Sequence, residues 1–260
     1  MILTAPAKIN LCLRVGPLRD DGFHRLATVF VAIDLRDTIE LHPAPATSVE
    51  GFPDTLITRA LEALGETRRV LVDKRIPVAA GLGGGSSDAA AVLRALRGRR
   101  PVDELYAIAR SLGSDVPFFL SGLEVALGTG RGDVLQPLPE FPRSFGVLLV
   151  PSQGRLSAAD VYARAQPNEI YPAVRGDLIR GVHTVRSAAD VAGLVANDLE
   201  PAAIELCPAI ADALASVRAA GALAAAVSGS GPTVFGLFGD RASAEAARAL
   251  IPGSIATGPV

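Results

Sequence analysis

The chain has 260 residues, of which 49% are apolar, so it is long enough for one large or two small domains with a well-buried core. Its formal net charge of −2 argues against non-specific nucleic-acid binding, which needs a basic surface. Two cysteines outside any CxxC motif and only three histidines argue against a zinc site, and the lack of a signal-peptide pattern makes a reducing, cytoplasmic setting the expectation.

Strand and helix patterns alternate along the first half of the chain. Apolar runs that alternate with polar residues, or that are rich in β-branched residues, predict strands over 9–15 and 28–41. Apolar residues at helical spacing predict a helix over 56–64. A third strand over 70–76 is predicted to lead into a glycine-rich loop, and a second helix is predicted over 105–112.

The second half begins with a strand pattern over 145–150 that ends at Pro151, and a polar stretch over 152–190 is predicted to hold helical pieces. The remaining elements follow in the order helix, strand, strand, helix: 208–220, 222–228, 233–238 and 242–250. Helices and strands mix without a regular βαβ repeat, which predicts an α+β fold. We place a domain boundary near Pro151, which gives domains over 1–150 and 151–260.

One uncharged stretch, 219–239, is about as long as a membrane span. The segment Ser228-Gly-Ser-Gly-Pro-Thr233 interrupts it with turn residues. Buried strands joined by a glycine turn are therefore expected, and no membrane helix.

Four glycines fall within the five positions 81–85, directly before a run of helix formers. Ser86, Ser87 or Asp88 is predicted to N-cap a helix that begins at about Ala89. A helix N-terminus carries unpaired N–H groups and the positive end of the dipole, and glycines let phosphate oxygens approach the backbone. The pattern therefore predicts a phosphate-binding loop, although neither the Walker motif nor the dinucleotide fingerprint matches it. A tight strand–helix turn or a flexible connector is the alternative.

Only two of the 25 basic residues are lysines, Lys8 and Lys74, and the others are arginines. A genomic bias toward arginine accounts for the surface. Lysine is a compact point charge whose pKa is readily tuned, so a position that keeps lysine indicates a site that needs the ammonium group. Chance survival of each lysine is the alternative.

Six segments follow one another over nearly the whole chain: Ala5-Pro-Ala-Lys-Ile-Asn10, Asp21-Gly-Phe-His24, Pro77 to Ala91, Leu112-Gly-Ser-Asp-Val-Pro-Phe-Phe119, Asn197-Asp-Leu-Glu-Pro201 and Ser228-Gly-Ser-Gly-Pro232. In sequence, order and spacing they resemble the motifs of the GHMP kinase superfamily and, within it, of the 4-diphosphocytidyl-2-C-methyl-D-erythritol kinases. The resemblance implies a two-domain GHMP kinase-like fold with its active site in the cleft between the domains.

The same resemblance implies ATP-dependent phosphorylation of the 2-hydroxyl of 4-diphosphocytidyl-2-C-methyl-D-erythritol, in the non-mevalonate route to isoprenoid precursors. The cofactors that it implies are ATP and Mg²⁺, with the metal ligands left unassigned. The expected partner is this small molecule, with no nucleic acid and no membrane, and the expected assembly is a monomer or a weak homodimer.

Two residues match the catalytic positions of the family. The resemblance makes Asp115 the base for the substrate hydroxyl and Lys8 the cation that steadies the incoming oxygen and the γ-phosphate. Considered without the resemblance, Asp115 is an ordinary turn or cap residue, and Lys8 is a strand residue whose stem snorkels to the surface.

The substrate and nucleotide positions are carried over in the same way. Phe23, in place of the family's usual tyrosine, and His24 are expected to bind the cytosine, with core packing as the alternative for Phe23. Asn10 and Tyr162 are further expected substrate contacts. The nucleotide phosphates are assigned to the glycine loop and its flanks: Pro77, Val78, Ala79, Ala80, Gly81, Leu82, Gly83, Gly84, Gly85, Ser86 and Ser87.

Two other functions remain open from the sequence. One is another GHMP small-molecule kinase, acting on mevalonate or homoserine, against which Gly22-Phe-His24 and the triple glycine 83–85 argue. The other is a catalytically silent nucleotide-binding protein of the same fold, against which the joint presence of Lys8 and Asp115 argues. Thr55 stands where the family usually has asparagine, so no adenine contact is assigned there.

Overall fold

The computed structural model of the chain describes residues 1–52, 55–152, 154, 156–166 and 169–260, which form two compact units. Unit 1 contains Met1–Lys8, Leu35–Val78 and Gly83–Leu123, and unit 2 contains Ile9–Asp34, Ala79–Leu82 and Glu124–Val260. Both units combine helices with strands, which confirms the α+β prediction. The domain boundary near Pro151 stays a prediction.

Unit 1 is built on strands in the order β3 (Ser48–Glu50), β4 (Arg68–Asp73), β2 (His24–Pro43) and β1 (Ile2–Leu18), of which β1 and β2 continue into unit 2. β4 pairs antiparallel with the C-terminal part of β2, and β3 pairs parallel with β4. Ile39 and Leu41 on β2, and Val70 and Val72 on β4, are buried and alternate with more exposed residues. One face of this part of the sheet is therefore buried.

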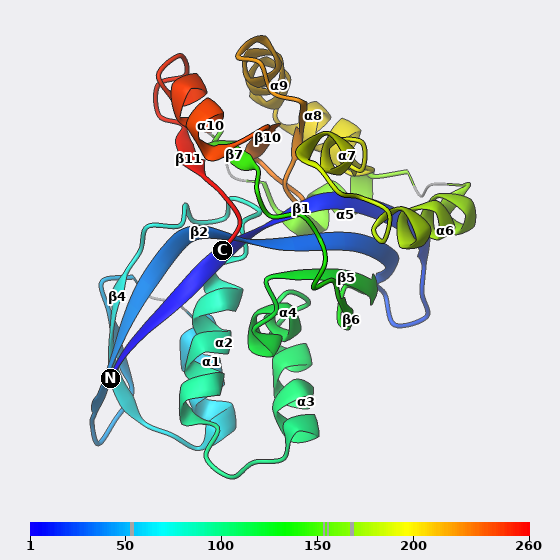
Figure 1. Cartoon of the computed structure of the whole chain (residues 1–260). Helices are drawn as coiled ribbons and strands as arrows, with labels where there is room; N and C mark the ends of the chain where they lie inside the picture. The colour runs from blue at the N-terminus through cyan, green and yellow to red at the C-terminus, as the bar shows by residue number, and fades with distance from the viewer. Residues whose placement is uncertain (53–54, 153, 155, 167–168) are drawn as a thin grey trace. The chain divides into compact units, whose positions relative to one another are not determined.

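Four helices complete unit 1: α1 (Thr55–Leu64), α2 (Gly84–Leu96), α3 (Val102–Leu112) and α4 (Val116–Ser121). They pack against one another, α1 on α2 and α3, and α2 on α3 and α4 (Figure 1). Ile57, Leu61 and Leu64 form the buried stripe of α1 at helical spacing. The helices predicted over 56–64 and 105–112 are confirmed.

The helix after the glycine loop begins earlier than the sequence predicted. α2 starts at Gly84, with Gly83 as its N-cap in the left-handed conformation and without a side-chain cap bond. The prediction that one of residues 86–88 caps a helix beginning at Ala89 is therefore wrong. The glycines themselves form the first turn, since the Ser87 N–H donates to the Gly83 carbonyl at 2.9 Å. Glycine costs about 1 kcal/mol relative to alanine inside a helix, so tertiary contacts have overridden propensity here.

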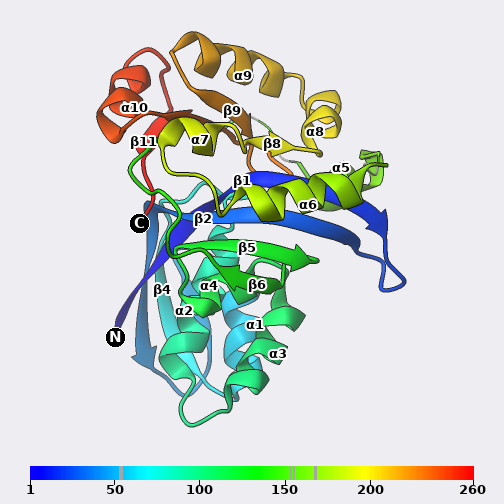
Figure 2. The ribbon, with the colours of Figure 1, turned by 45° about the vertical axis from the view of Figure 1, so that its right-hand side comes forward.

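In unit 2, β5 and β8 pair with the parts of β2 and β1 that belong to this unit, and β6 pairs with β5. β5 (Val125–Gly130) pairs antiparallel with the N-terminal part of β2 and with β6 (Val134–Pro137), and Figure 2 shows β5 and β6 as two neighbouring green arrows. β8 (Ala196–Asn197) pairs parallel with β1. These short pairings were not predicted from the sequence.

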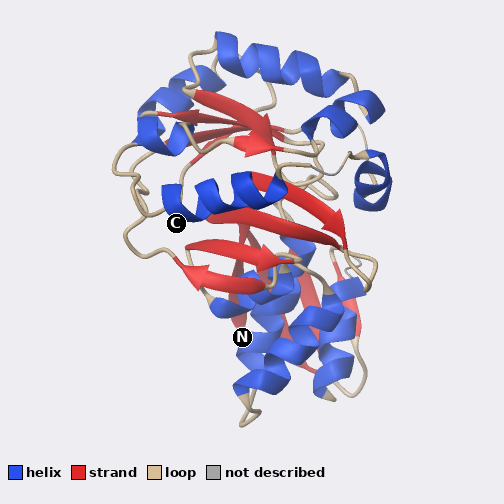
Figure 3. Cartoon of the chain, turned by 90° about the vertical axis from the view of Figure 1, so that its right-hand side faces the viewer, coloured by secondary structure: helices blue, strands red, loops and turns tan. Residues whose placement is uncertain are grey.

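Unit 2 also holds a second, antiparallel sheet, in the order β11 (Ile255–Thr257), β7 (Gly146–Val150), β10 (Val234–Phe238) and β9 (Ala224–Val227). Helices α9 (Ala209–Ala219) and α10 (Arg241–Arg248) pack on it (Figure 3). A β-carbon at Gly236 of β10 would overlap Val217 of α9, so glycine lets this helix lie close to the sheet. The C-terminal elements thus occur in the predicted order, with bounds shifted by a few residues.

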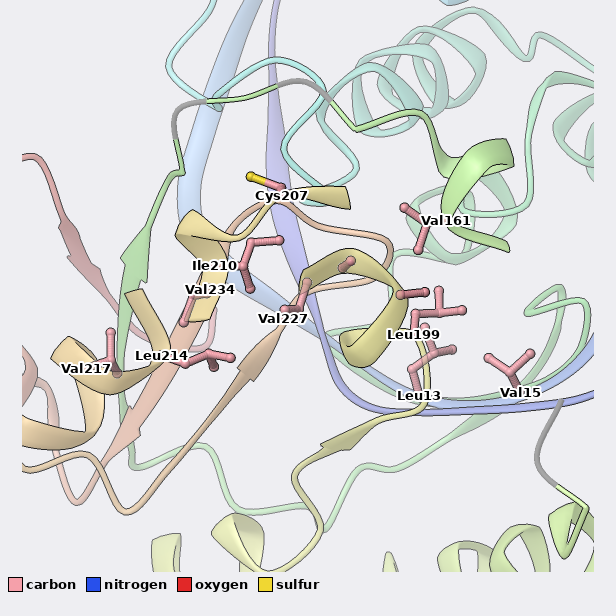
Figure 4. Close-up of a cluster of buried hydrophobic side chains, with 12 residues drawn as sticks. Leu13, Val15, Val161, Leu199, Cys207, Ile210, Leu214, Val217, Val227 and Val234 are labelled. Carbon is pink, nitrogen blue, oxygen red and sulfur yellow. The ribbon is translucent and has the colours of Figure 1, made fainter. Parts of the chain in front are cut away.

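A cluster of buried apolar side chains joins α9 to strands β9, β10 and β1 of unit 2 (Figure 4). Ile210, Leu214 and Val217 lie at helical spacing on α9, and Val227 and Val234 complete the cluster from the sheet. Four short helices precede α9 in the chain: α5 (Ala158–Arg164), α6 (Tyr171–Gly181), α7 (Ala188–Ala192) and α8 (Glu200–Leu206). Of these, α5 and α8 contribute buried residues to the cluster. Helical pieces over 152–190 are therefore confirmed as α5 to α7, while residues 153, 155, 167 and 168 lie outside the described part. None of the described helices has the length and apolar character needed to cross a bilayer.

Candidate active site

Lys8 and Asp115 meet inside unit 1. The Lys8 ammonium lies 3.4 Å from Asp115 Oδ2, and the exposed fractions of the two side chains are 3% and 29%. A buried ammonium group is costly unless it is paired, and Asp115 supplies the opposite charge. Lys8 is therefore buried in an ion pair and does not reach the surface. Asp115 precedes α4, but its side chain makes no cap bond to that helix.

Gly83, the N-cap residue of α2, lies against this ion pair. Gly83 has φ of 73°, a conformation that suits glycine. A β-carbon at this position would lie 2.8 Å from Cε2 of Phe119 and 3.2 Å from Cε of Lys8. The absence of a side chain at Gly83 therefore allows the loop backbone, the Lys8 stem and the Phe119 ring to meet.

The first turn of α2 offers an anion-binding end. Gly84, Gly85 and Ser86 are partly exposed, whereas Ser87 is 1% exposed. The Ser87 Oγ has no hydrogen-bond partner among the described residues, although a buried hydroxyl normally has one. Before the loop, Pro77 is partly exposed and Val78 is exposed. This turn thus combines unpaired helix N–H groups with an unsatisfied hydroxyl.

The middle of the glycine loop, residues 79–82, belongs to unit 2 and rests on the second glycine loop. Ala79 is exposed with φ of 54°, Ala80 and Leu82 are buried, and Gly81 has φ of 74°. A β-carbon at Gly81 would overlap the Ser228 carbonyl. The Ser228 hydroxyl donates to the Gly81 carbonyl at 3.1 Å. The two glycine-rich loops therefore meet backbone to backbone.

The segment Asn197-Asp-Leu-Glu200 holds that second loop in place. Asn197 Nδ2 donates to the carbonyls of Val227 and Gly229, both at 2.8 Å. Glu200 Oε2 accepts the Val227 N–H at 3.0 Å. Burial raises the pKa of Glu200, while this hydrogen bond and the charge of Arg218 act in the opposite direction. Side chains of this segment thus hold the backbone at the start of the second glycine loop through hydrogen bonds.

Asn10 is 4% exposed and is bonded to the neighbouring strand. Its Nδ2 donates to Thr28 Oγ1 at 2.8 Å, and the Thr28 hydroxyl donates to the Cys12 carbonyl at 2.7 Å. The Asn10 N–H donates to Ser228 Oγ at 3.4 Å. Asn10 therefore links β1, β2 and the second glycine loop in unit 2.

His24 and Tyr162 come together in unit 2. Their rings stack with centroids 5.7 Å apart and an interplanar angle of 26°. His24 Nδ1 lies 2.9 Å from the Gly16 carbonyl. Because a carbonyl only accepts, Nδ1 carries the hydrogen, and Nε2 of the neutral ring is an acceptor.

Phe23 lies next to His24 in the chain but makes a different ring contact. It is 45% exposed, and the Arg131 guanidinium lies 4.8 Å from its ring centroid. Arg131 is also paired with Asp133 in the turn between β5 and β6. Such a cation–π contact contributes about 0.5–2 kcal/mol. Sequence reasoning missed Arg131, because its contact depends on a β-turn that lies about a hundred residues from Phe23 in the chain.

Comparison with family models gives two matches. The model described as "GHMP kinases N terminal domain" matches residues 55–123. The model described as "GHMP kinases C terminal" matches residues 179–252. The first range contains the whole glycine loop and Asp115, and the second contains the segment 197–200 and the second glycine loop.

Curated relatives match almost the whole chain. A relative from Paracoccus denitrificans, named 4-diphosphocytidyl-2-C-methyl-D-erythritol kinase, is 40% identical over 96% of this chain and 91% of its own. A relative of the same name from Pelobacter propionicus is 40% identical over 98% of this chain and 95% of its own. A solved structure titled as a 4-(cytidine 5'-diphospho)-2C-methyl-D-erythritol kinase is 36% identical over the full length of both chains, with a TM-score of 0.75. A solved structure of a homoserine kinase from Cytophaga hutchinsonii shares the fold, with a TM-score of 0.67. It is 18% identical over 100% of this chain and 94% of its own.

Proposed function

The chain belongs to the family of 4-diphosphocytidyl-2-C-methyl-D-erythritol kinases, and on that premise we propose that it transfers the γ-phosphoryl group of ATP to the 2-hydroxyl of 4-diphosphocytidyl-2-C-methyl-D-erythritol. The family resemblance predicted from six sequence segments is thereby confirmed, and with it the GHMP kinase fold. The observation that carries the chemistry is the Lys8–Asp115 ion pair beside Gly83.

We assign the reacting groups to this pair. Asp115 accepts the proton of the 2-hydroxyl as its oxygen bonds to the γ-phosphorus. The bond from that phosphorus to the β,γ-bridging oxygen breaks, and ADP leaves with the electron pair. The Lys8 ammonium, held within 3.4 Å of the base, stabilises the negative charge that the transferring group and the incoming oxygen share. Phosphoryl transfer needs little beyond this positioning and charge stabilisation.

We assign the ATP phosphates to residues 77–87, and chiefly to the first turn of α2. The N–H groups of this turn and the unsatisfied Ser87 hydroxyl are suited to phosphate oxygens. No group of three metal-ligating side chains occurs among the described residues. Mg²⁺ keeps several waters and binds through phosphates and one or two protein oxygens. Ser87 is the protein oxygen that we propose for it, and Mg²⁺ would neutralise phosphate charge there.

We assign the cytosine to Phe23, His24 and Tyr162. The exposed Phe23 ring offers a stacking face, and Arg131 holds its orientation from the β5–β6 turn. His24 Nε2, an acceptor because Nδ1 is bonded to Gly16, suits the exocyclic amine of cytosine. We also propose that Asn10 belongs to the substrate site, where its bond to Thr28 fixes the position of β1.

We further propose that the enzyme works in the cytoplasm as a monomer or weak homodimer, without nucleic-acid or membrane partners. We also propose that the chain has two domains, residues 1–150 and residues 151–260. Gel filtration with light scattering tests the assembly, and a concentration-independent mass of a larger oligomer would contradict it.

The test of function is an ADP-release assay with a panel of acceptors. Purified protein with ATP and Mg²⁺ is offered the cytidine-diphosphate substrate, mevalonate, homoserine or no acceptor. ADP release above background with the first acceptor alone is expected, and Asp115→Asn is the control for contaminating kinases. Preferential release with mevalonate or homoserine would replace the substrate. No release with any acceptor, while ATP still binds, would support the catalytically silent alternative.

A further inference from the structure

A buried charge cluster in unit 1 joins β2, the end of β4 and α2. The Lys74 ammonium donates to Asp37 Oδ2 at 2.7 Å and to Asp88 Oδ2 at 2.8 Å. Both carboxylates are fully buried, and the Lys74 side chain is 12% exposed. We call these three residues the Asp37–Lys74–Asp88 cluster. It sets two buried carboxyl groups against one ammonium group.

Backbone N–H groups bind one of these carboxyl groups. Asp37 Oδ1 accepts the N–H of Arg75 at 2.7 Å and of Ile76 at 2.9 Å. Asp88 follows the first turn of α2. Burial acts to lower the pKa of Lys74, but the hydrogen bonds and charges of Asp37 and Asp88 outweigh it and raise that pKa above its ordinary value. The ammonium group is therefore charged at neutral pH.

The cluster involves the residues on both sides of the glycine-loop segment 77–87. Arg75 and Ile76, whose N–H groups Asp37 holds, directly precede the segment 77–87, and Asp88 directly follows it. Within α2, a β-carbon at Gly84 would lie 3.1 Å from the Lys74 nitrogen. The ammonium group therefore lies directly behind the first residue of the helix.

A contribution to stability alone does not account for this cluster. Replacing a buried ion pair or triad by apolar groups of similar volume is often neutral or stabilising, because desolvation offsets the attraction. Directional hydrogen bonds between charged groups, in contrast, fix positions. The feature that this cluster fixes is the relation between the strand that enters the loop and the helix that leaves it.

We propose that Asp37 and Asp88 are positioning residues for nucleotide binding. Acting through Lys74 and the N–H groups of residues 75 and 76, they hold the two ends of the glycine loop at the separation that presents the first turn of α2 to the ATP phosphates. This inference rests on the proposed function, since it requires that the loop binds ATP.

The experiment compares Asp37→Asn, Asp88→Asn and Asp73→Asn. Asparagine keeps the size of Asp37 and an oxygen for the two N–H groups, but its NH₂ then faces the Lys74 ammonium, donor against donor. Asp73→Asn is the matched control, because this carboxylate adjoins Lys74 in sequence yet is 60% exposed and forms an ion pair with Arg75. The measurements are the Kd of ATP with Mg²⁺ by calorimetry, and KM for ATP and for the cytidine-diphosphate substrate.

For Asp37→Asn we expect the Kd and KM of ATP to rise about tenfold or more, because the first turn of α2 is then no longer held where its N–H groups meet the phosphates. KM for the acceptor should change less than twofold, and Asp73→Asn should match the wild type. If Asp37→Asn does not fold, Asp88→Asn decides, because it leaves every Asp37 bond in place; a threefold weaker ATP affinity with unchanged acceptor KM is expected.

Two results would overturn the inference. One is an unchanged ATP affinity in the folded variants, and the other is an equal loss for ATP and acceptor, which a general structural defect produces. A wild-type protein that does not bind ATP would instead remove the proposed function, so the two failures are distinguishable.

Discussion

Replacing Gly83 by alanine tests the contact between the glycine loop and the ion pair. The backbone there has φ of 73°, and the new β-carbon would lie 2.8 Å from the Phe119 ring and 3.2 Å from the Lys8 stem. Gly122 provides a matched control in the same unit, with φ of 72°; among the described residues, only Arg94 Nη1 would lie within 4 Å of the corresponding β-carbon, at 3.9 Å. The two substitutions share the backbone cost and differ in the contact.

The expected sizes follow from that difference. Alanine in the left-handed region costs about 1–2 kcal/mol, so Gly122→Ala should lower the free energy of unfolding by this amount and leave turnover near normal. Gly83→Ala should lose about 1–3 kcal/mol more through overpacking. Each kcal/mol lowers the Tm of a chain of this size by about 2–4 °C. Because Lys8 must move, kcat should also fall about 10²-fold.

Thermal melts and steady-state phosphorylation of the cytidine-diphosphate substrate, measured on both variants and the wild type, give these quantities. Normal turnover in Gly83→Ala, or equal losses in Gly83→Ala and Gly122→Ala, would refute the reasoning. The contact of Gly83 with Lys8 would then have no part in the reaction.

Three further predictions follow from named groups. Asp115→Asn should lower kcat about 10²–10⁴-fold with little change in the Kd of ATP, measured by calorimetry, and a wild-type rate would exclude Asp115 as the base. Lys8→Arg should lose about 10²-fold in turnover, because the wider, forked guanidinium displaces the reacting hydroxyl, and overpacking of the buried site should also lower its Tm; near-normal turnover would remove Lys8 from the mechanism. Burial raises the pKa of Cys12 from 9.0 to about 11, so as pH rises above 9 the unfolded thiol loses its proton before the native one, and stability falls. Urea unfolding at pH 8 and 10.5 should therefore show the wild type losing about 2 kcal/mol more than Cys12→Ala, and equal losses would contradict the shift.

The sequence predicted the major elements because their patterns are strong. The helix over 56–64 and the strand over 145–150 have clear periodicity or continuous apolar runs, and both appear in the structure. The start of α2 was predicted wrongly because Gly84 and Gly85 have low helix propensity, which their tertiary surroundings override. The two-residue strand β8 has too few residues to carry a pattern.

The candidate site divides in a similar way. Lys8 and Asp115 could be singled out because each lies in a recognisable motif, and the scarcity of lysine pointed to both Lys8 and Lys74. Asp37 carried only a weak signal, as a charged residue inside the apolar strand pattern 28–41. Arg131 carried none, because its partner Phe23 lies in a different hairpin. Contacts between such distant segments depend on tertiary structure, which periodicity does not encode.

The position of the new phosphate tests the central claim most directly. Among the three free hydroxyls of the methylerythritol portion, the 2-hydroxyl is tertiary, so its carbon bears no hydrogen. Proton-coupled ³¹P NMR of the product formed with ATP should therefore show a new phosphomonoester signal without three-bond splitting from a carbinol proton, and this signal should be missing with Asp115→Asn. A doublet would place the phosphate on the secondary 3-hydroxyl, a triplet on the primary 1-hydroxyl, and no new signal would mean that this molecule is not the substrate; each of these results would contradict the account.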